Sequence, residues 1–159
     1  MRTVRHILLV ILAFLVQTTW IHQVSIFQIQ PDLVVLVLVF IALRTGPFEA
    51  TLLGFAIGLI EDAYAPPDLG LTALAKSIIG FAAGYTHSRI QADNPQVQVV
   101  LIFVAVLVHE VIYYIGYSGI SLNDAPYYWW RYGLGRAVYT ALCGLVYSYA
   151  LVGRRYLSV

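Results

Sequence analysis

Six apolar stretches, each separated from the next by polar or turn-forming residues, run through a chain of only 159 residues. With 60% hydrophobic and 11% charged residues, the chain is too apolar for an ordinary soluble domain and too short for two substantial ones. Stretches of this kind are typical of membrane helices. We therefore predict one all-α integral membrane domain, residues 1–159, a compact bundle with spans near 6–21, 31–43, 47–64, 69–87, 97–117 and 132–152.

The second stretch is the shortest. Its uninterrupted apolar run, 33–43, falls short of the roughly 20 residues that a helix needs to cross a bilayer. The run fits a buried or re-entrant segment as well as a short or broken span. Pro31 suits the first turn of a helix, and Asp32 beside it suits the positive end of the helix dipole.

The first stretch has some features of a signal peptide, because Arg2 and Arg5 precede the apolar run 7–16. Signal peptidase sites need small residues, and Gln17-Thr18-Thr19-Trp20 is a poor match. More apolar stretches follow. We therefore expect an uncleaved first helix.

The basic residues predict the orientation of the spans. On one side of the predicted spans lie Arg2, Arg5, Arg44, Arg89, Arg154 and Arg155. The opposite loops, near 22–30, 65–68 and 118–131, carry only Arg131. Cytoplasmic loops are enriched in Lys and Arg, so we expect both termini to be cytoplasmic.

Aromatic residues gather near the predicted outer boundary, most densely in the run 127–132. Amphipathic rings settle at the depth of the lipid headgroups, so this run is interpreted as an interfacial belt. A dedicated patch for a partner protein is the alternative.

Residues 47–89 are predicted to form a helical hairpin that turns at Pro66 and Pro67. Each helix has one face with residues at steps of four: Gly54, Gly58 and Asp62 on the first, and Lys76, Gly80 and Gly84 on the second. Small residues allow two helices to approach closely in lipid. One antiparallel register puts glycine opposite glycine twice and places Asp62 opposite Lys76.

A lone lysine in hydrocarbon is costly, by about 2.5 to 3.5 kcal/mol on insertion scales. Lys76 therefore needs a carboxylate within the bundle. Asp62 is the predicted partner, and Glu61 next to it is the alternative.

The fifth and sixth stretches carry a second candidate ion pair, Glu110 with Arg136. A structural pair that fixes helix order and a proton or ligand pathway would both use such groups, and we favour the structural interpretation. The sixth stretch also has a small-residue face: Ala137, Ala141, Gly144 and Ser148. That face should receive another helix, either from this chain or from a partner.

Several function classes find no support in the sequence. It has no HExxH, GxSxG or GxxxxGK[ST] motif. Its single cysteine, Cys143, excludes a disulfide within the chain and a multi-cysteine metal site. The net charge of +1, with scattered basic residues, gives no reason to expect nucleic-acid binding. We therefore expect no enzyme activity, cofactor or metal.

Five motifs, taken in order, resemble the rod shape-determining protein MreD family. They are Gln30-Pro31-Asp32-Leu33, Arg44-Thr45-Gly46-Pro47, the run 54–62, Pro67-Asp68-Leu69-Gly70 and the run 80–84. The resemblance implies a multi-pass protein of the bacterial inner membrane that serves cell elongation without catalysis of its own. It also implies binding to the bitopic protein MreC and work with MreB, RodA and a penicillin-binding transpeptidase.

The resemblance further implies a fold similar to the substrate-binding subunits of energy-coupling-factor vitamin transporters. A solute-binding subunit is therefore the rival function, with Glu110, His109 or Lys76 in a pocket open to the outside. Such subunits dock to their partner through an alanine-rich first helix, whereas the run 7–16 here has only Ala13. We therefore favour a scaffold and expect no small-molecule ligand.

Overall fold

The computed structural model describes residues 2–20, 29–64, 66–87 and 94–157, which form helices and loops without a β-strand. The elements are α1 Arg2–Trp20, α2 Leu33–Thr45, α3 Pro47–Asp62, η1 Pro66–Asp68, α4 Leu71–Tyr85, α5 Pro95–Gly116, α6 Ala125–Tyr128, η2 Trp129–Gly133 and α7 Leu134–Leu157. The six long helices coincide with the six apolar stretches, so the predicted all-α class is confirmed.

Length and composition single out one helix among those described. α5 is long and apolar enough to cross a membrane. Residues Arg5–Thr19, α2 and α4 form helices that are apolar but shorter.

α2 lies at the centre of the bundle. Nine of its 13 residues are buried, and it packs against α1, α3, α4, α5 and α7. A helix that is apolar on every side is buried on every side, which explains the uninterrupted apolar run. At about 1.5 Å per residue, α2 is about 20 Å long. Of the alternatives for the second stretch, the structure has a short, buried helix.

Both ends of α2 follow from local sequence. The Asp32 carboxylate accepts a hydrogen bond from the Val35 amide at 2.8 Å and caps the helix. At the other end Gly46 has φ +90°, a conformation that side chains rarely adopt. Pro47 then occupies the first turn of α3, where its missing N–H is not needed.

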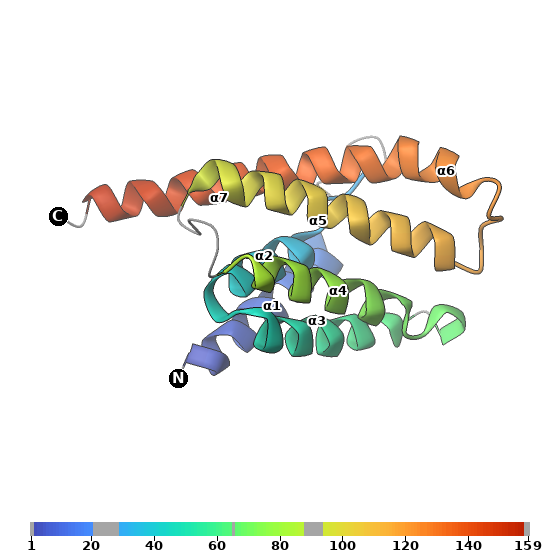
Figure 1. Ribbon diagram of the computed structural model, residues 1–159, viewed down its shortest axis with the longest axis horizontal. Coiled ribbons are helices and arrows are strands. Elements are labelled where there is room, and N and C mark those ends of the chain that lie inside the picture. The colour runs from blue at the N-terminus through green and yellow to red at the C-terminus, as the bar shows by residue number, and fades with distance from the viewer. Residues whose placement is uncertain (1, 21–28, 65, 88–93, 158–159) are drawn as a thin grey trace.

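Two helix pairs flank α2. α3 packs along α4 and α5 packs along α7, while α1 lies against α2. α1 begins and α7 ends at one end of the bundle, and η1 and the loop from α5 to α6 lie at the other (Figure 1).

The distribution of polarity is the reverse of that in an ordinary soluble protein. Large apolar side chains are exposed on the outer faces of all the long helices except α2, as at Leu12, Phe55 and Val146. Lys76 and Glu110 are fully buried. The apolar surface is therefore outside and the charge inside.

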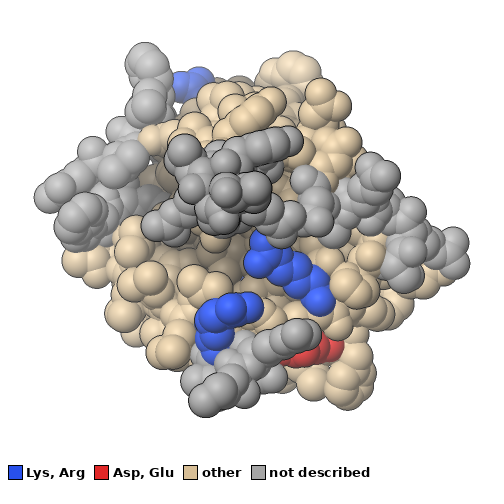
Figure 2. All heavy atoms as spheres, turned by 90° about the vertical axis from the view of Figure 1, so that its left-hand side faces the viewer, with Lys and Arg blue, Asp and Glu red and all other residues tan. Residues whose placement is uncertain are grey.

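Basic side chains appear at the end where α1 begins (Figure 2). There Arg5 and Arg44 line a shallow pocket together with His6, which lies 3.4 Å from Glu49. Arg131 belongs to η2, at the opposite end of the bundle. Of the other basic residues used to predict the orientation, Arg89 lies outside the described residues, as do the side chains of Arg2, Arg154 and Arg155.

The aromatic run near α6 is partly exposed. Tyr127 and Trp130 are 59% and 69% exposed. The Trp129 indole turns inward and donates a hydrogen bond to the Leu107 carbonyl at 3.3 Å. Both the interfacial belt and the partner patch remain predictions for this run.

Candidate functional site

The glycines of the α3–α4 hairpin bring the two backbones into contact. A Cβ added at Gly58 would lie 2.6 Å from the Ala73 nitrogen, and one at Gly84 would lie 2.5 Å from the Pro47 Cα. Gly54 and Gly80 face backbone atoms of Lys76 and Ala50 in the same way. No side chain fits between these backbones, so the small-residue faces are the packing faces of the hairpin.

The predicted register of this hairpin is wrong by about two helical turns. Gly54 lies opposite Lys76 rather than Gly84, and Gly58 lies opposite Ala73 rather than Gly80. Residues at steps of four recur on the same face, so a shift of two turns leaves the pattern of small residues unchanged. We expected each glycine to face another glycine. Instead, the glycines face backbone atoms of Ala50, Ala73 and Lys76.

Asp62 does not pair with Lys76. Its two carboxylate oxygens accept hydrogen bonds from the backbone amides of Gly70, Thr72 and Ala73, at 2.9, 3.1 and 3.0 Å. Asp62 therefore caps the start of α4, where a negative charge meets the positive end of the helix dipole. Gly70 has φ +98°, which the turn from η1 into α4 requires.

Glu61 is the partner of Lys76. The Lys76 ammonium donates to Glu61 Oε2. The lysine side chain is 1% exposed and the glutamate side chain 18% exposed. The structure therefore has the alternative pair, Glu61 with Lys76, in place of the predicted pair, Asp62 with Lys76. Glu61 Oε1 is buried and has no partner within the described chain.

The structure brings Glu110 and Arg136 together. Arg136 Nη1 donates to Glu110 Oε1 at 2.9 Å, and the Glu110 side chain is fully buried. His109 Nδ1 lies 3.3 Å from the same oxygen. A Cβ added at Gly133 would lie 3.1 Å from the Glu110 Cβ, so the glycine lets η2 approach α5 at this point.

Two polar residues that sequence reasoning missed tie the cluster to α2. The Thr140 hydroxyl accepts the Asp32 amide at 2.9 Å and donates to the Arg136 carbonyl at 2.8 Å. Gln17 Oε1 accepts the Val34 amide at 3.1 Å. In the sequence, Gln17 is marked only as a polar residue at the end of an apolar run, and Thr140 only as a polar residue within one.

Replacing Thr140 with valine should destabilise the bundle by about 1 to 3 kcal/mol, because the buried Asp32 amide loses its acceptor. The loss is measured as a lower midpoint of thermal unfolding in detergent. Thr51→Val is the matched control, since within the described residues the Thr51 hydroxyl donates to the Pro47 carbonyl of its own helix and to no other helix. Equal stability of the two variants would contradict this role of Thr140.

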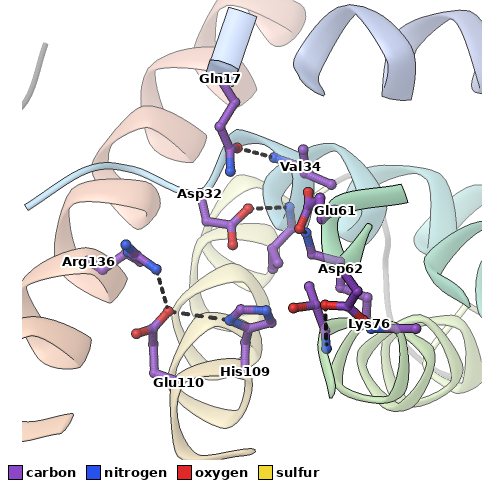
Figure 3. A network of polar contacts seen from close by, with 12 residues as sticks. Gln17, Asp32, Val34, Glu61, Asp62, Lys76, His109, Glu110 and Arg136 are labelled. Carbon is purple, nitrogen blue, oxygen red and sulfur yellow. Dashed lines mark hydrogen bonds and ion pairs between the residues drawn. The ribbon is translucent and has the colours of Figure 1, made fainter. Parts of the chain in front are cut away.

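A cavity of about 210 Å³ lies among these groups. Its lining residues come from α1, α3, η1, α4, α5, α7 and the start of α2: Gln17, Asp32, Glu61, Asp62, Asp68, Thr72, His109, Tyr113 and Arg136. His109 lies between the Glu110–Arg136 pair and the Glu61–Lys76 pair (Figure 3). Two ion pairs that sequence reasoning treated separately therefore belong to one polar cluster.

The family model described as rod shape-determining protein MreD matches residues 1–150. The chain belongs to the MreD family. Comparison with curated proteins and comparison with solved structures each gave no match. The family membership agrees with the five motifs and is consistent with a role in determining rod shape.

In this member of the MreD family, the motif residues shape turns and helix ends. Pro31 is buried next to the Asp32 cap. The segment from Arg44 to Pro47 ends α2 and starts α3. Pro67 lies in η1, which leads through Gly70 into α4. Three of the five motifs thus fix the connections between the helices, and the runs 54–62 and 80–84 lie within α3 and α4.

The small-residue face of α7 is occupied by α5 of the same chain. Ala137 and Ala141 are buried, and a Cβ added at Gly144 would meet the end of the Ile102 side chain. Ser148 donates to Gln98 at 2.6 Å. Of the two predicted alternatives, the structure therefore has a helix of this chain, and not of a partner, against that face.

No group of three or more His, Cys, Asp or Glu residues in the described part of the chain is placed to hold a metal ion. Cys143 is a free, half-buried thiol.

Proposed function

We propose that this chain is a multi-pass inner-membrane scaffold of the rod-shape machinery, with both termini in the cytoplasm. The observation that carries the proposal is the reversed polarity of the bundle. Its buried charges are held by partners on neighbouring helices, as in the Glu61–Lys76 and Glu110–Arg136 pairs. Its outer faces are apolar and suit lipid or the helix of another protein. Membership of the MreD family supports the cellular role.

We further propose that a groove between α1 and α7 receives the membrane helix of an MreC-like bitopic protein. The groove has a volume of about 310 Å³ and runs over α2. It is lined by Leu9, Leu12, Ala13, Val16, Leu33, Leu36, Val37, Cys143 and Tyr147. Apart from the tyrosine hydroxyl these side chains are apolar, so the groove suits a hydrophobic helix. Through this partner the chain would help to position MreB, RodA and a penicillin-binding transpeptidase.

A solute-binding transport subunit is the second candidate function. The polar cavity beside His109 favours it, because a transport subunit needs an enclosed site for its solute. Against it, the outward face of α1 is formed by large residues such as Leu8, Leu12 and Leu15 rather than by alanines.

The single cysteine allows a direct test of the scaffold function. Cys143 lines the groove and is labelled with a thiol-reactive photo-crosslinker in the otherwise native chain. On illumination in native membranes, we expect an equimolar adduct with an MreC-like bitopic protein, identified by mass spectrometry.

The matched control moves the cysteine to the neighbouring residue, as Cys143→Ser with Leu142→Cys. Leu142 is 56% exposed, is not part of the groove and points about 100° away around the helix. An adduct of equal yield from this control would contradict docking in the groove. An adduct with a transport-ATPase partner instead would favour the second candidate function.

A further inference from the structure

His109 presents an unused hydrogen-bond acceptor to the polar cavity. Its side chain is 6% exposed, and Nδ1 faces Glu110 Oε1. A carboxylate only accepts, so we assign the ring hydrogen to Nδ1, and this tautomer leaves Nε2 as an acceptor. Nε2 has no partner in the described part of the chain. A buried acceptor of this kind needs a donor from outside the chain.

Glu61 adds a second unused acceptor. Its Oε2 holds Lys76, but its Oε1 is buried and has no partner among the residues described. Glu61 and His109 come from α3 and α5 and line the same cavity. Two helices thus present lone pairs to one space.

The cavity also carries more negative than positive charge. Its lining contains four carboxylates and one guanidinium, which belongs to Arg136. Arg136 is engaged by Glu110, and Lys76 is engaged by Glu61. Asp62 is satisfied by three backbone amides. The buried Asp32 accepts the Val35 amide and has no ion-pair partner in the described chain. Buried charge of this kind is costly unless it is compensated.

One wall of the cavity is aromatic. The Tyr113 ring stacks on His109 with centroids 6.2 Å apart and on Tyr117 with centroids 5.2 Å apart.

We propose that this cavity binds a small organic cation, a protonated amine or a guanidinium, whose N–H groups donate to Glu61 Oε1, His109 Nε2 and the Asp32 carboxylate. The volume of about 210 Å³ has room for such a head group on a short chain. In the described part of the chain, no three His, Cys, Asp or Glu residues are placed to hold one metal ion. The spread of acceptors instead suits the several N–H groups of an organic cation. The site revises the expectation that the chain has no small-molecule ligand, and it does not rest on the scaffold function.

The test is isothermal titration of the purified full chain in detergent, at constant ionic strength, with n-butylammonium and methylguanidinium chlorides. We expect saturable binding of at least one of them. Tetramethylammonium, a cation without N–H donors, should bind about tenfold more weakly or worse. The absence of saturable binding by both donor cations would overturn the proposal, as would equally tight binding of tetramethylammonium.

The affinity of the Asp32→Asn variant tests whether the cation binds in this cavity. Asparagine caps a helix about as well as aspartate, so this variant should keep the start of α2 while it removes one charge from the cavity. Affinity for the bound cation should fall about tenfold. His109→Leu removes the Nε2 acceptor, whereas Glu110 keeps Arg136 as its partner. This variant should cause a similar loss and replaces the first variant if that variant does not fold.

Glu49→Gln is the control, because Glu49 contacts His6 at the other end of the bundle and does not line the cavity. Its affinity should equal that of the parent chain. Unchanged affinity in the Asp32 or His109 variant would place the binding site elsewhere. The crosslink from Cys143 should form in all these variants, so failure of cation binding and failure of the scaffold function are distinguishable.

Discussion

Replacing Gly58 with alanine should destabilise the bundle by about 1 to 3 kcal/mol, the range typical of overpacked cores. The new methyl group would lie 2.6 Å from the Ala73 nitrogen and 2.8 Å from the Thr72 carbonyl carbon. These are backbone atoms, so α3 and α4 would have to separate. Gly58→Leu should therefore prevent folding. The measurement is the fraction of monodisperse protein that survives heating in detergent, followed by size-exclusion chromatography.

Gly135→Ala is the matched control. There the added methyl group would meet mainly the flexible end of the Ile29 side chain, which can move aside. Alanine also favours a helix over glycine, by about 1 kcal/mol. This variant should match or exceed the stability of the parent chain. A Gly58→Ala variant as stable as Gly135→Ala would contradict direct backbone contact between α3 and α4.

Replacing Lys76 with methionine should cost about 3 to 5 kcal/mol, because Glu61 is then left as a mostly buried carboxylate without its cation. A second change, Glu61→Gln, should restore most of the loss, because two neutral groups cost less than one unpaired charge. Asp62→Asn in place of the second change should restore nothing. Both carboxylate oxygens of Asp62 accept backbone amides at the start of α4, and asparagine has only one acceptor oxygen, so this change adds to the damage. Thermal unfolding of the parent chain and these three variants in one detergent gives the comparison.

The sequence was sufficient to predict where the long helices lie. Apolar runs and turn residues mark α3 and α4 on either side of Pro66, and the turn at Gly46 explains the sharp boundary between α2 and α3. Local chemistry determines these features, so they can be read without a structure. The contact between Glu110 and Arg136 could also be predicted from the sequence, because α5 and α7 are successive long helices that pack together.

The hairpin register could not be predicted in the same way. Steps of four repeat on one face, so several registers place small residues together. What decides between them is the turn, where Asp62 is used to cap α4 and is no longer free to pair with Lys76. Asp62 can cap α4 because of the path that the backbone takes from η1 through Gly70. That path cannot be predicted from the spacing of residues.

The cavity was beyond sequence reasoning for a related reason. Asp32, Glu61 and His109 are far apart in the chain and come together because α2 is buried at the centre. The apolar run 33–43 fitted a re-entrant segment or a broken span as well as a buried helix, so the central position of α2 could not be inferred from it. From the sequence, His109 was placed only in the pocket of the rival transport function. In the structure Glu110 reaches back to the ring, and Nε2 is left for the cavity.

The central claim is that buried charges on neighbouring helices neutralise one another and hold the bundle together. The most direct test is a double-mutant cycle on unfolding free energies for Lys76→Met with Glu61→Gln, and in parallel for Lys76→Met with Asp62→Asn. The account predicts a coupling of about 2 kcal/mol or more for Lys76 with Glu61, and about 0.5 kcal/mol or less for Lys76 with Asp62. Additive effects of the Lys76 and Glu61 changes, or a stronger coupling to Asp62, would contradict it.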